Sequence, residues 1–567
     1  MDFCGTVPRR RQPCTTGRSG SYGKQIGDDL QAPFRGFAEY FFVAAPPLYA
    51  RATPLTSARR LLYHVPKTER SDVLMAMQNG AAPRPNLVFL LADDMGAWAL
   101  HCAGNTDIQT PNLDRMARRG MRFDNFFCAS PVCSPARASI LTGTMPSRHG
   151  VLDWLDGGNL AADHPFAQGR PAFAHESRPI RYLESLTAYT DLLAQAGYHC
   201  GLCGKWHLGD SLHPQHGFTD WYTIARGGCD YFHPEMVEKG EVYEADGYVT
   251  DLLGSRAVEW LQRYAAQDAP FYLSVHFTAP HDPWDADQHP REYLDLYKDC
   301  AFTATPDLPL HPNQVHTCQY GTGARRKELL RGYYAAISAM DHWVGRILDQ
   351  LEESGVLDNT IVVFTSDNGM NLGQHGIWGK GNGTFPQNMY DSSVKVPFLM
   401  MAPGRVAEGT VCEEMFSHYD LFPTLCELCG VPCRSIQPLP GHSFAPWLTD
   451  PDRQNPAPVV VYDEYGPVRM IRRRDCKLVL RTPYGPNELY DLVQDPGEEH
   501  NLYGQAAYEP LVLALSREMD AWFRRYADPA FDARCEGVAG TGQHDRPGCY
   551  ASLADRYGPR PAYVKEK

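Results

Sequence analysis

The sequence predicts an α/β protein with a doubly wound, mostly parallel sheet flanked by helices, followed by a smaller antiparallel sheet with one helix. From Pro85 onward, continuous apolar runs of strand length alternate with longer segments of helical periodicity. Uninterrupted apolar runs are typical of strands covered on both faces, and strands that alternate with helices form parallel sheets. The strands predicted for the parallel sheet are 86–92, 198–203, 271–277 and 360–365.

Two helical patterns lie between these strands. Residues 182–196 and 329–354 repeat apolar side chains at helical spacing, and a glycine follows each of them, Gly197 and Gly355. Glycine directly after the last periodic residue is a common C-terminal stop of a helix. We therefore expect one helix in each segment.

After about Pro458 the chain changes to short β-like segments, which predict a small antiparallel sheet closed by one helix. The helix is expected near 511–526. The predicted strands are 459–462, 468–472, 477–481 and 488–492.

These patterns divide the chain into a large α/β domain at 84–455, an α+β subdomain at 456–530 and an irregular tail at 531–567. Residues 1–80 are Arg-rich at their start and show no clear periodicity. We expect them to lie outside the fold, either as a disordered extension or as sequence upstream of a start at Met75 or Met77.

Composition narrows the functional classes. The 567 residues are 43% apolar and 21% charged, which is typical of a globular protein, and the formal charge of −14 argues against general nucleic-acid binding. No stretch reaches the roughly 18–20 apolar residues of a membrane span, so no membrane partner is expected. The 17 cysteines are an odd number without a disulfide-like spacing. Free thiols fit a reducing compartment, which favours a cytoplasmic location.

The most informative stretch is Cys133-Ser134-Pro135-Ala136-Arg137, at the start of a predicted helix. Pro135 suits a first helical position, and residues four apart share one helix face, so the thiol and the guanidinium should lie together. A helix N-terminus and a cation both favour an anion there. The alternative is that Cys133 is a small buried hydrophobe, as most free cysteines are.

Polar side chains follow each of the four predicted parallel strands. Ligands of open α/β sheets bind beyond the carboxyl ends of the strands, so these residues should meet in one site. In strand order they are Asp93 and Asp94, then Lys205 and His207, then His281, then Asp367 and Asn368.

Asp93, Asp94, Asp367 and Asn368 would supply three carboxylates and one amide oxygen. This hard oxygen set suits Ca²⁺, with Mg²⁺ as the alternative. Adjacent acids also occur at solvated turns, but two pairs that each follow an apolar strand favour a metal.

Three basic residues are expected at the same site. Lys205 and His207 are two residues apart, so an extended segment would point both to one side. Lys380 lies between Gly379 and Gly381, small neighbours that would let a ligand approach the backbone closely. Outside this context, a lone lysine would be expected on the solvated surface, and His281 would be an ordinary loop histidine.

Several motifs together resemble the type I sulfatases, a formylglycine-dependent family of the alkaline-phosphatase-like superfamily. Cys133 to Arg137 with Thr142-Gly143 resembles the first signature of the family, and Gly204 to Gly209 resembles the second. The resemblance extends from about Pro85 to Tyr503. It also includes the motifs Thr110-Pro111-Asn112-Leu113-Asp114, Tyr419-Asp420-Leu421-Phe422-Pro423-Thr424 and Leu489-Tyr490-Asp491-Leu492.

The resemblance implies that a formylglycine-generating or radical maturase enzyme oxidises Cys133 to formylglycine, the catalytic residue. Its hydrated form would lie near the metal, be deprotonated by Asp367 and attack sulfur. By the same resemblance, Arg137 would orient the diol. The metal site would comprise Asp93, Asp94, Asp367, Asn368 and the modified Cys133.

The remaining roles are likewise implied by the resemblance. Lys205 and Lys380 would neutralise the sulfuryl oxygens, and His281 with Lys380 would protonate the departing alcohol. His207 would accept a proton when sulfate is expelled and the aldehyde is restored.

The expected function is therefore hydrolysis of a sulfate ester, on a sulfated small molecule or glycan. One alternative is a phosphodiesterase or phosphonate monoester hydrolase of the same superfamily, although Asn368 favours sulfate because phosphate-cleaving relatives commonly have histidine there. Another alternative is a non-catalytic carbohydrate-binding pseudosulfatase in which Cys133 stays unoxidised. The substrate surface is expected to include Trp154, Asp153, Trp378 and His375, an apolar face with hydrogen-bonding partners.

Overall fold

Strand β1 (Asn86–Ala92) lies at the centre of the fold, with all of its residues buried. Side chains alternate across a strand, so β1 packs against a layer of side chains on each face of the sheet. The computed structural model describes residues 83–463, 467–482, 485–531 and 542–547, and the predicted extension at 1–80 lies outside them. One core contains Leu87, Phe89 and Leu91, and the other contains Val88, Leu90 and Ala92.

The predicted doubly wound, mostly parallel sheet is confirmed. Within the described chain it has ten strands in the order β12-β2-β11-β8-β1-β7-β3-β4-β5-β6. Strand β1 pairs in parallel with β7 and β8, and β3 pairs in parallel with β7 and β4. The strand bounds in sheet order are β12 Thr410–Ser417, β2 Met121–Phe127, β11 Phe398–Met401, β8 Thr360–Ser366, β1 Asn86–Ala92, β7 Phe271–His276, β3 His199–Gly204, β4 Asp220–Ile224, β5 Glu235–Glu238 and β6 Glu241–Glu244.

The four predicted parallel strands form as expected, with ends shifted by at most one residue. Six further strands were not predicted, because polar residues interrupt their sequences or because, as in the four-residue β11, they are short. Polar Arg122, Asp124 and Asn125 interrupt β2, whereas β5 and β6 are short and rich in glutamate. These strands form because neighbouring strands supply backbone partners, which a local pattern does not encode.

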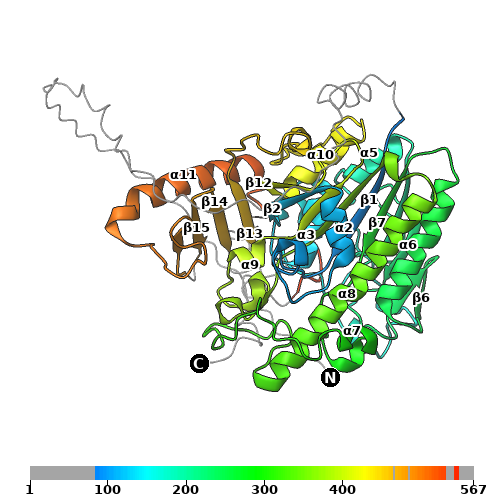
Figure 1. Cartoon of the computed structure of the whole chain (residues 1–567), viewed down its shortest axis with the longest axis horizontal. Helices are drawn as coiled ribbons and strands as arrows, with labels where there is room; N and C mark the ends of the chain where they lie inside the picture. The colour runs from blue at the N-terminus through cyan, green and yellow to red at the C-terminus, as the bar shows by residue number, and fades with distance from the viewer. Residues whose placement is uncertain (1–82, 464–466, 483–484, 532–541, 548–567) are drawn as a thin grey trace, which may run out of the picture. The chain divides into compact units, whose positions relative to one another are not determined.

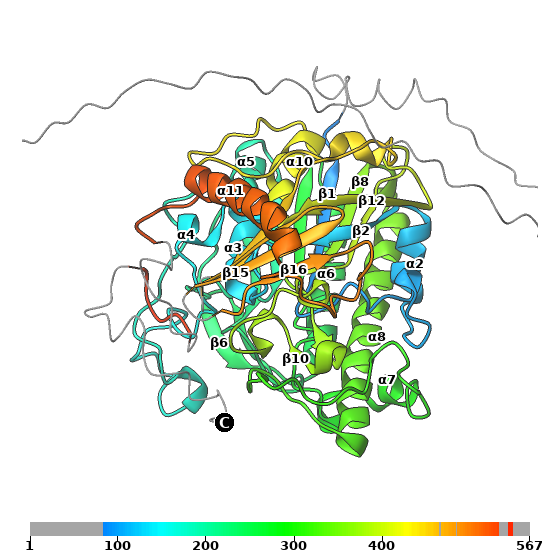
Figure 2. The same cartoon turned by 90° about the vertical axis from the view of Figure 1, so that its left-hand side faces the viewer.

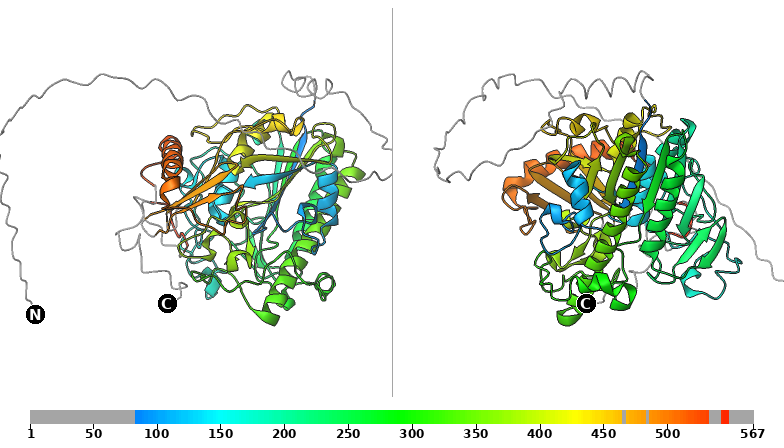
Figure 3. Two further views of the ribbon diagram at one scale, coloured as in Figure 1. Left: turned by 60° about the vertical axis from the view of Figure 1, so that its left-hand side comes forward. Right: turned by 45° about the vertical axis from the view of Figure 1, so that its right-hand side comes forward.

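Helices cover both faces of the sheet. Those on one face share the core of Val88, and those on the other share the core of Leu87. Figure 1 and the right-hand view of Figure 3 show α6 and α8 side by side on the first face. The first face carries α2 (Pro111–Arg118), α6 (Val249–Ala265) and α8 (Gly323–Glu353), and the second carries α3 (Cys133–Thr142), α5 (Tyr189–Gln195) and α10 (Leu421–Leu428). Shorter elements are α4 (Pro146–His149), α7 (Arg291–Asp295), α9 (Asp391–Val394), β9 (Asn371–Leu372) and β10 (Trp378–Gly379).

The helix predicted at 182–196 is wrong in its first half. Helix α5 begins only at Tyr189, and Asp191 Oδ2 accepts the backbone N–H of Ala188, which fixes this start. Tyr182 and Leu183 are buried in the core but lie in irregular backbone. Their apolar spacing therefore reflects burial rather than a helix. The second predicted helix is confirmed as α8, which begins six residues earlier than expected.

The C-terminal sheet is antiparallel, in the order β13-β14-β15-β16, and helix α11 (Glu509–Tyr526) packs on it (Figure 2). This confirms the predicted smaller sheet with one helix. Buried Lys477, in β15, joins the C-terminal sheet to the segment at the start of α9. It donates to Met389 O (2.9 Å) and Asp391 Oδ1 (2.5 Å) and pairs with Glu498. The strands are β13 Val459–Asp463, β14 Val468–Arg472, β15 Cys476–Arg481 and β16 Glu488–Asp491.

Part of the predicted irregular tail returns to the main fold. Gln543 forms an isolated parallel bridge with Leu155 and is buried. The domain boundaries proposed from composition remain predictions. Among the described residues, no helix combines the length and apolar character needed to cross a membrane.

Candidate active site

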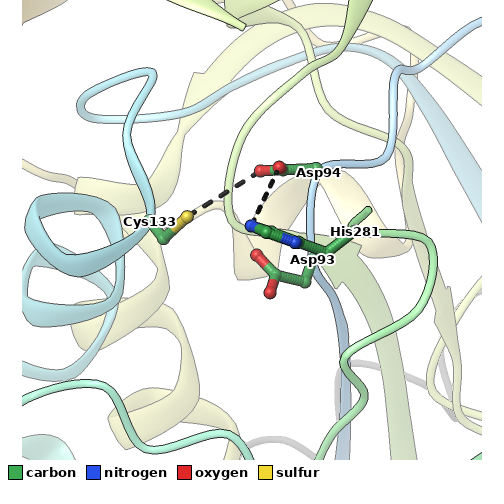
Figure 4. A group of neighbouring side chains, drawn as sticks. All are labelled: Asp93, Asp94, Cys133 and His281. Carbon is green, nitrogen blue, oxygen red and sulfur yellow. Dashed lines mark hydrogen bonds and ion pairs between the residues drawn. The ribbon is translucent and has the colours of Figure 1, made fainter. Parts of the chain in front are cut away.

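The carboxyl ends of four adjacent strands bring the candidate site together. Strands β8, β1, β7 and β3 are neighbours in the sheet, so the residues that follow them meet at one edge. Asp94, after β1, donates its backbone N–H to Asp367 Oδ1, after β8, over 3.1 Å. Figure 4 shows Asp93, Asp94 and His281 facing Cys133. The expected convergence on one site is therefore found.

Cys133 is the first residue of α3 and is 3% exposed. Its Sγ lies 2.8 Å from Lys380 Nζ and 3.8 Å from Asp94 Oδ1. Pro135 is the third residue of the helix rather than the first. The thiol therefore lies at a helix start with a cation and a carboxylate beside it.

Arg137 connects the acids that follow β1 and β8. Its Nε donates to Asp367 Oδ2 over 2.9 Å, and its Nη2 lies 3.5 Å from Asp93 Oδ1. A third contact runs from Nη1 to the carbonyl oxygen of Lys205, at 3.0 Å. Because Arg137 is buried and always charged, it fixes the carboxylates in place and offsets their mutual repulsion.

The two lysines hold different carboxylates. Lys205 is fully buried and pairs with Asp93. Lys380 donates to Asp94 Oδ1 over 2.6 Å. Burial opposes the charge on Lys380, but Asp94 and Cys133 outweigh it and hold the pKa of the amine well above its ordinary value. Both lysines are thus positioned as fixed positive charges.

The glycines beside Lys380 do not leave its backbone open to a ligand, so that expectation was wrong. A Cβ on Gly381 would lie 2.4 Å from Cγ of Pro131, so this glycine allows close packing within the protein. Gly379 has a φ of +120°, which side chains rarely tolerate. The glycines therefore shape the loop that aims Lys380.

His207 lies on the cavity wall, but the segment that carries it is not extended, contrary to expectation. Its φ is +55°, which breaks the alternation assumed for Lys205 and His207. Nε2 lies 3.0 Å from the carbonyl oxygen of Leu155. A carbonyl only accepts, so we assign the proton to Nε2 and a free lone pair to the buried Nδ1, which has no hydrogen-bond partner. Burial, with Lys205 and Arg137, holds the pKa of His207 well below its ordinary value.

His281 has the opposite electrostatic environment. Its Nδ1 lies 2.7 Å from the carbonyl oxygen of Asp282, and its Nε2 lies 3.6 Å from Asp94 Oδ2. Burial disfavours the charged ring, but Asp93 and Asp94 outweigh burial and hold the pKa of His281 well above its ordinary value. The pKa values of the two histidines are therefore shifted in opposite directions, which favours a neutral base at His207 and a charged acid at His281.

The acidic residues fit a hard divalent cation. Asp93 Oδ1 and Asn368 Oδ1 are buried without hydrogen-bond partners. The Asn368 amide is orientated by Nδ2, which donates to Asp94 Oδ1 (2.8 Å) and to Gly369 O (2.9 Å). Buried oxygens that accept no hydrogen bond are costly unless something binds them, and oxygens are what Ca²⁺ and Mg²⁺ prefer. Asp93, Asp94, Cys133 and His281 also form a group whose ligand atoms lie within 4.8 Å of one another.

The pKa shifts of the acidic residues also favour a bound cation. Burial would raise the pKa of Asp94, but Lys380 and His281 outweigh it and hold that pKa below the ordinary value. For Asp367, burial is outweighed by Arg137 in the same direction. Asp367 also accepts three N–H bonds, from Asp94, Asn368 and Arg137. A carboxylate held in this way is suited to being a metal ligand, and its role as a base stays a prediction.

A cavity of about 330 Å³ opens beside Cys133, His207, His281 and Lys380. Among the four residues expected on the substrate surface, only Trp154 lines it. Asp153 and Trp378 are instead buried, and His375 stacks on Tyr390 with ring centres 3.7 Å apart. The other polar residues of the wall, which the sequence did not indicate, are Asp156, Asn159, Glu176, Arg226, His316, Thr317 and Asn382.

Asn388 is a second feature that sequence reasoning missed. Its Nδ2 donates to the carbonyl oxygens of Lys380 and Gly381, each over 3.1 Å, and its Oδ1 accepts from Ser393 Oγ over 2.6 Å. These bonds fix the loop that aims Lys380. An isolated asparagine in a loop carries no local signal of such a role.

Family models match most of the described chain. One, described as Sulfatase, matches residues 85–431, and a second, described as N-sulphoglucosamine sulphohydrolase, C-terminal, matches residues 373–524. Together they span both sheets.

Individual proteins match over similar lengths. An N-acetylglucosamine-6-O-sulfatase of Bacteroides thetaiotaomicron is 27% identical, over 80% of this chain and 88% of its own. A choline-sulfatase of Rhizobium meliloti is 30% identical, over 79% of this chain and 88% of its own. A solved structure of a protein in complex with that protein's substrate, D-glucosamine-2-N,6-O-disulfate, superimposes on this chain with a TM-score of 0.64. The two are 25% identical, over 79% of this chain and 99% of that one.

Proposed function

Because this chain belongs to the sulfatase family, we propose that it hydrolyses a sulfate ester of a carbohydrate, using formylglycine formed from Cys133 and a divalent cation. The observation that carries the proposal is the position of Cys133. Its Sγ is 2.8 Å from Lys380 Nζ, beside Asp94 and on the same cavity as His207 and His281. A nucleophile, a fixed cation, an acid and a base thus surround one space.

The residues that would hold the cation are Asp93, Asp94, Asp367 and Asn368, with the modified residue 133 beside them. Ca²⁺ is the ion we favour and Mg²⁺ is the alternative, because the donor set contains only hard oxygens, which both ions prefer. When bound, the cation would polarise the sulfuryl group and lower the pKa of a hydroxyl at residue 133. Arg137 keeps Asp93 and Asp367 orientated for this purpose.

The lysines supply positive charge where negative charge gathers during sulfuryl transfer. Lys380 Nζ is close enough to Sγ of Cys133 to contact an oxygen of a sulfate bound there. Lys205 is not among the cavity residues and is paired with Asp93, so it acts through that carboxylate. Charges that are positioned before the reaction need no reorganisation when it occurs.

The two histidines divide the proton transfers. His281 is held protonated by Asp93 and Asp94, so its Nε2 donates a proton to the departing alcohol oxygen. His207 is held neutral with Nδ1 free, so it accepts the proton when sulfate leaves. Each ring is orientated by a backbone carbonyl, of Asp282 and of Leu155 respectively.

A carbohydrate suits the cavity because its wall combines one aromatic surface with several polar side chains. Trp154 offers a face for a sugar ring, and Asp156, Asn159 and Asn382 offer hydrogen-bonding groups for hydroxyls. The name of the N-acetylglucosamine-6-O-sulfatase relative supports the same substrate class. A sulfated small molecule such as choline sulfate, the substrate named for another relative, would leave most of these groups unused.

A substrate screen tests the proposal. Protein produced together with a cysteine-oxidising maturase is supplied with Ca²⁺ and offered sulfated monosaccharides and disaccharides, choline sulfate, an aryl sulfate and a phosphodiester. We expect the highest kcat/KM on a sulfated sugar, with inorganic sulfate released in proportion. A higher kcat/KM on the phosphodiester would overturn the sulfatase assignment, and a higher value on choline sulfate would overturn the carbohydrate assignment.

A further inference from the structure

A second cluster of ligating side chains lies at the outer side of the cavity wall. Asp156, His175 and His544 each offer one atom, and these atoms lie within 4.8 Å of one another. His175 Nδ1 is hydrogen-bonded to Asp156 Oδ2, and His544 Nε2 lies 3.7 Å from the same oxygen. The two imidazole ring centres are 4.5 Å apart. His544, from near the C-terminus of the sequence, thus joins Asp156 and His175, which are 19 residues apart, at one carboxylate oxygen.

The convergence is built into the fold by Gln543. This side chain is 3% exposed, and its Oε1 accepts the backbone N–H of Leu152 over 2.7 Å while its Nε2 donates to Gly150 O over 2.9 Å. Its backbone N–H donates to Trp154 O (2.7 Å), and its carbonyl accepts from Asp156 N (3.1 Å). The backbone that carries His544 is therefore held in place by the buried, hydrogen-bonded residue before it.

Ion pairs fix the other side of the same segment. Asp545 pairs with Arg178 (2.9 Å), and Arg546 pairs with Glu184 (2.7 Å). Residues 542–546 are thus tied both to the loop that carries Asp156 and to the segment that carries His175. Both imidazoles already lie beside Asp156, so binding a ligand there requires little ordering of the chain.

A glycine makes the close approach feasible. Gly542 has a φ of +93°, and a Cβ built there would lie 2.6 Å from Cβ of Asp156. A larger residue at 542 would push the segment away from Asp156 and open the cluster. The backbone is therefore shaped to bring His544 to this carboxylate.

We propose that Asp156, His175 and His544 form a binding site for a divalent transition-metal ion, with Zn²⁺ as the representative. Two neutral imidazoles and a carboxylate form a nitrogen and oxygen set that suits Zn²⁺, Co²⁺ or Ni²⁺ and disfavours Ca²⁺. The ion would bind His175 through Nδ1 and His544 through Nε2, each ring keeping its proton on the other nitrogen. The His175 and His544 side chains are 54% and 42% exposed, so water completes the coordination and the ion can enter from solvent.

Binding would fasten one wall of the substrate cavity. Asp156 lines the cavity together with Trp154, two residues before it. An ion held by His175 and His544 would fix the Asp156 carboxylate and hold residues 542–546 against this wall. This consequence rests on the proposed function and predicts an effect on KM for a sugar substrate, whereas the binding itself is independent of any activity.

The test uses tag-free full-length protein in excess Ca²⁺, which occupies the hard oxygen set beside Cys133. Zn²⁺ is titrated against the protein by calorimetry, in competition with a chelator of known affinity. Co²⁺ absorption spectra report whether imidazole nitrogen is bound. The variants are His544→Ala and His175→Ala, whose side chains are exposed enough for the fold to survive. The matched control is His233→Ala, which removes an exposed histidine 3.3 Å from Asp246 in a pair without a second imidazole.

We expect the wild type to bind one equivalent of Zn²⁺. Both variants should lower the Zn²⁺ affinity by more than the ~10–100-fold that outer-shell changes cost, while His233→Ala leaves the affinity unchanged. Zn²⁺ should raise the melting temperature of the wild type but not of His544→Ala. Unchanged Zn²⁺ stoichiometry and affinity in His544→Ala would overturn the site. Sulfate-ester hydrolysis without Zn²⁺ binding would overturn this inference alone, and Zn²⁺ binding without hydrolysis would overturn only the proposed function.

Discussion

Lys380 Nζ lies 2.8 Å from Sγ of Cys133, although 247 residues separate them. The same nitrogen donates to Asp94 Oδ1 over 2.6 Å. One charged amine thus contacts both the position of the nucleophile and a proposed metal ligand. Lys380 is therefore a sensitive probe of the account.

Lys380→Ala should lower sulfate release by about 10²–10³-fold, because it removes a preorganised charge from the reacting centre. The measurement is kcat for a sulfated sugar at saturating Ca²⁺. Lys395→Ala is the control, since Lys395 pairs with Asp391 and is not among the cavity residues. A loss smaller than about tenfold in Lys380→Ala would contradict the assigned role.

Asp94→Ala and Asp367→Ala should each lose bound divalent metal as well as activity. Removing one carboxylate leaves fewer and less charged oxygens for the ion. Elemental analysis after dialysis against Ca²⁺ measures the metal content, and Asp124→Ala, at an exposed carboxylate paired with Arg122, serves as the control. A full metal complement in both site variants would show that the ligands are misassigned.

The histidines should fail in different ways. His281→Ala should impair substrates with poor alkoxide leaving groups far more than activated aryl sulfates, whose phenolate needs little protonation. Because Asp93 and Asp94 raise the pKa of His281, its acid form is present below that pKa and is lost as pH rises through it. For the wild type, kcat on a sugar sulfate should therefore fall as the pH rises through this pKa. In His281→Ala, this fall in kcat at high pH should be absent.

His207→Ala should instead slow turnover of both substrate kinds and let a sulfated enzyme adduct accumulate. Intact mass measured after mixing with substrate detects the added sulfuryl group. If His281→Ala traps the adduct and His207→Ala shows the leaving-group dependence, the two roles must be exchanged.

Asn388→Ala tests the support of the lysine loop. The carbonyl oxygens of Lys380 and Gly381 would each lose a donor, which should cost about 1–3 kcal/mol of unfolding free energy. As a positioning residue, Asn388 should affect kcat more than KM. Asn359→Ala is the control, because this half-buried asparagine also makes two hydrogen bonds, to Arg84 O and from Arg405, and it is not among the cavity residues. Equal effects of the two variants on kcat would reduce Asn388 to an ordinary structural residue.

The sequence predicted the parts of the fold that local pattern encodes. Strand β1 was predicted with its bounds because all of its residues are buried, and Asp93 and Asp367 were placed at one site because the ends of neighbouring parallel strands meet. Strand β2 was missed because Arg122 and Asp124 interrupt its apolar pattern. Its pairing with β11 and β12 depends on contacts that a local window does not contain.

The cavity wall was the least predictable part of the site. Trp378 is of a residue type that often contacts substrates, but it is buried. Asp156 and Glu176 line the cavity from loops that carry no recognisable motif. Likewise, the positive φ of His207 breaks the extended geometry that the sequence suggested for this segment. Which way a loop residue points is decided by tertiary packing, such as the contact of His207 with Leu155.

The most direct test of the central claim is inorganic sulfate release by the wild type and by Cys133→Ala, both produced with the maturase and saturated with Ca²⁺. The comparison variant is Cys412→Ala, which removes another buried thiol, in β12 at the edge of the sheet. We expect Cys412→Ala to keep wild-type release. Cys133→Ala should lose several orders of magnitude while remaining folded, because the nucleophile is absent. Release by Cys133→Ala above about a tenth of the wild-type rate would contradict catalysis through residue 133.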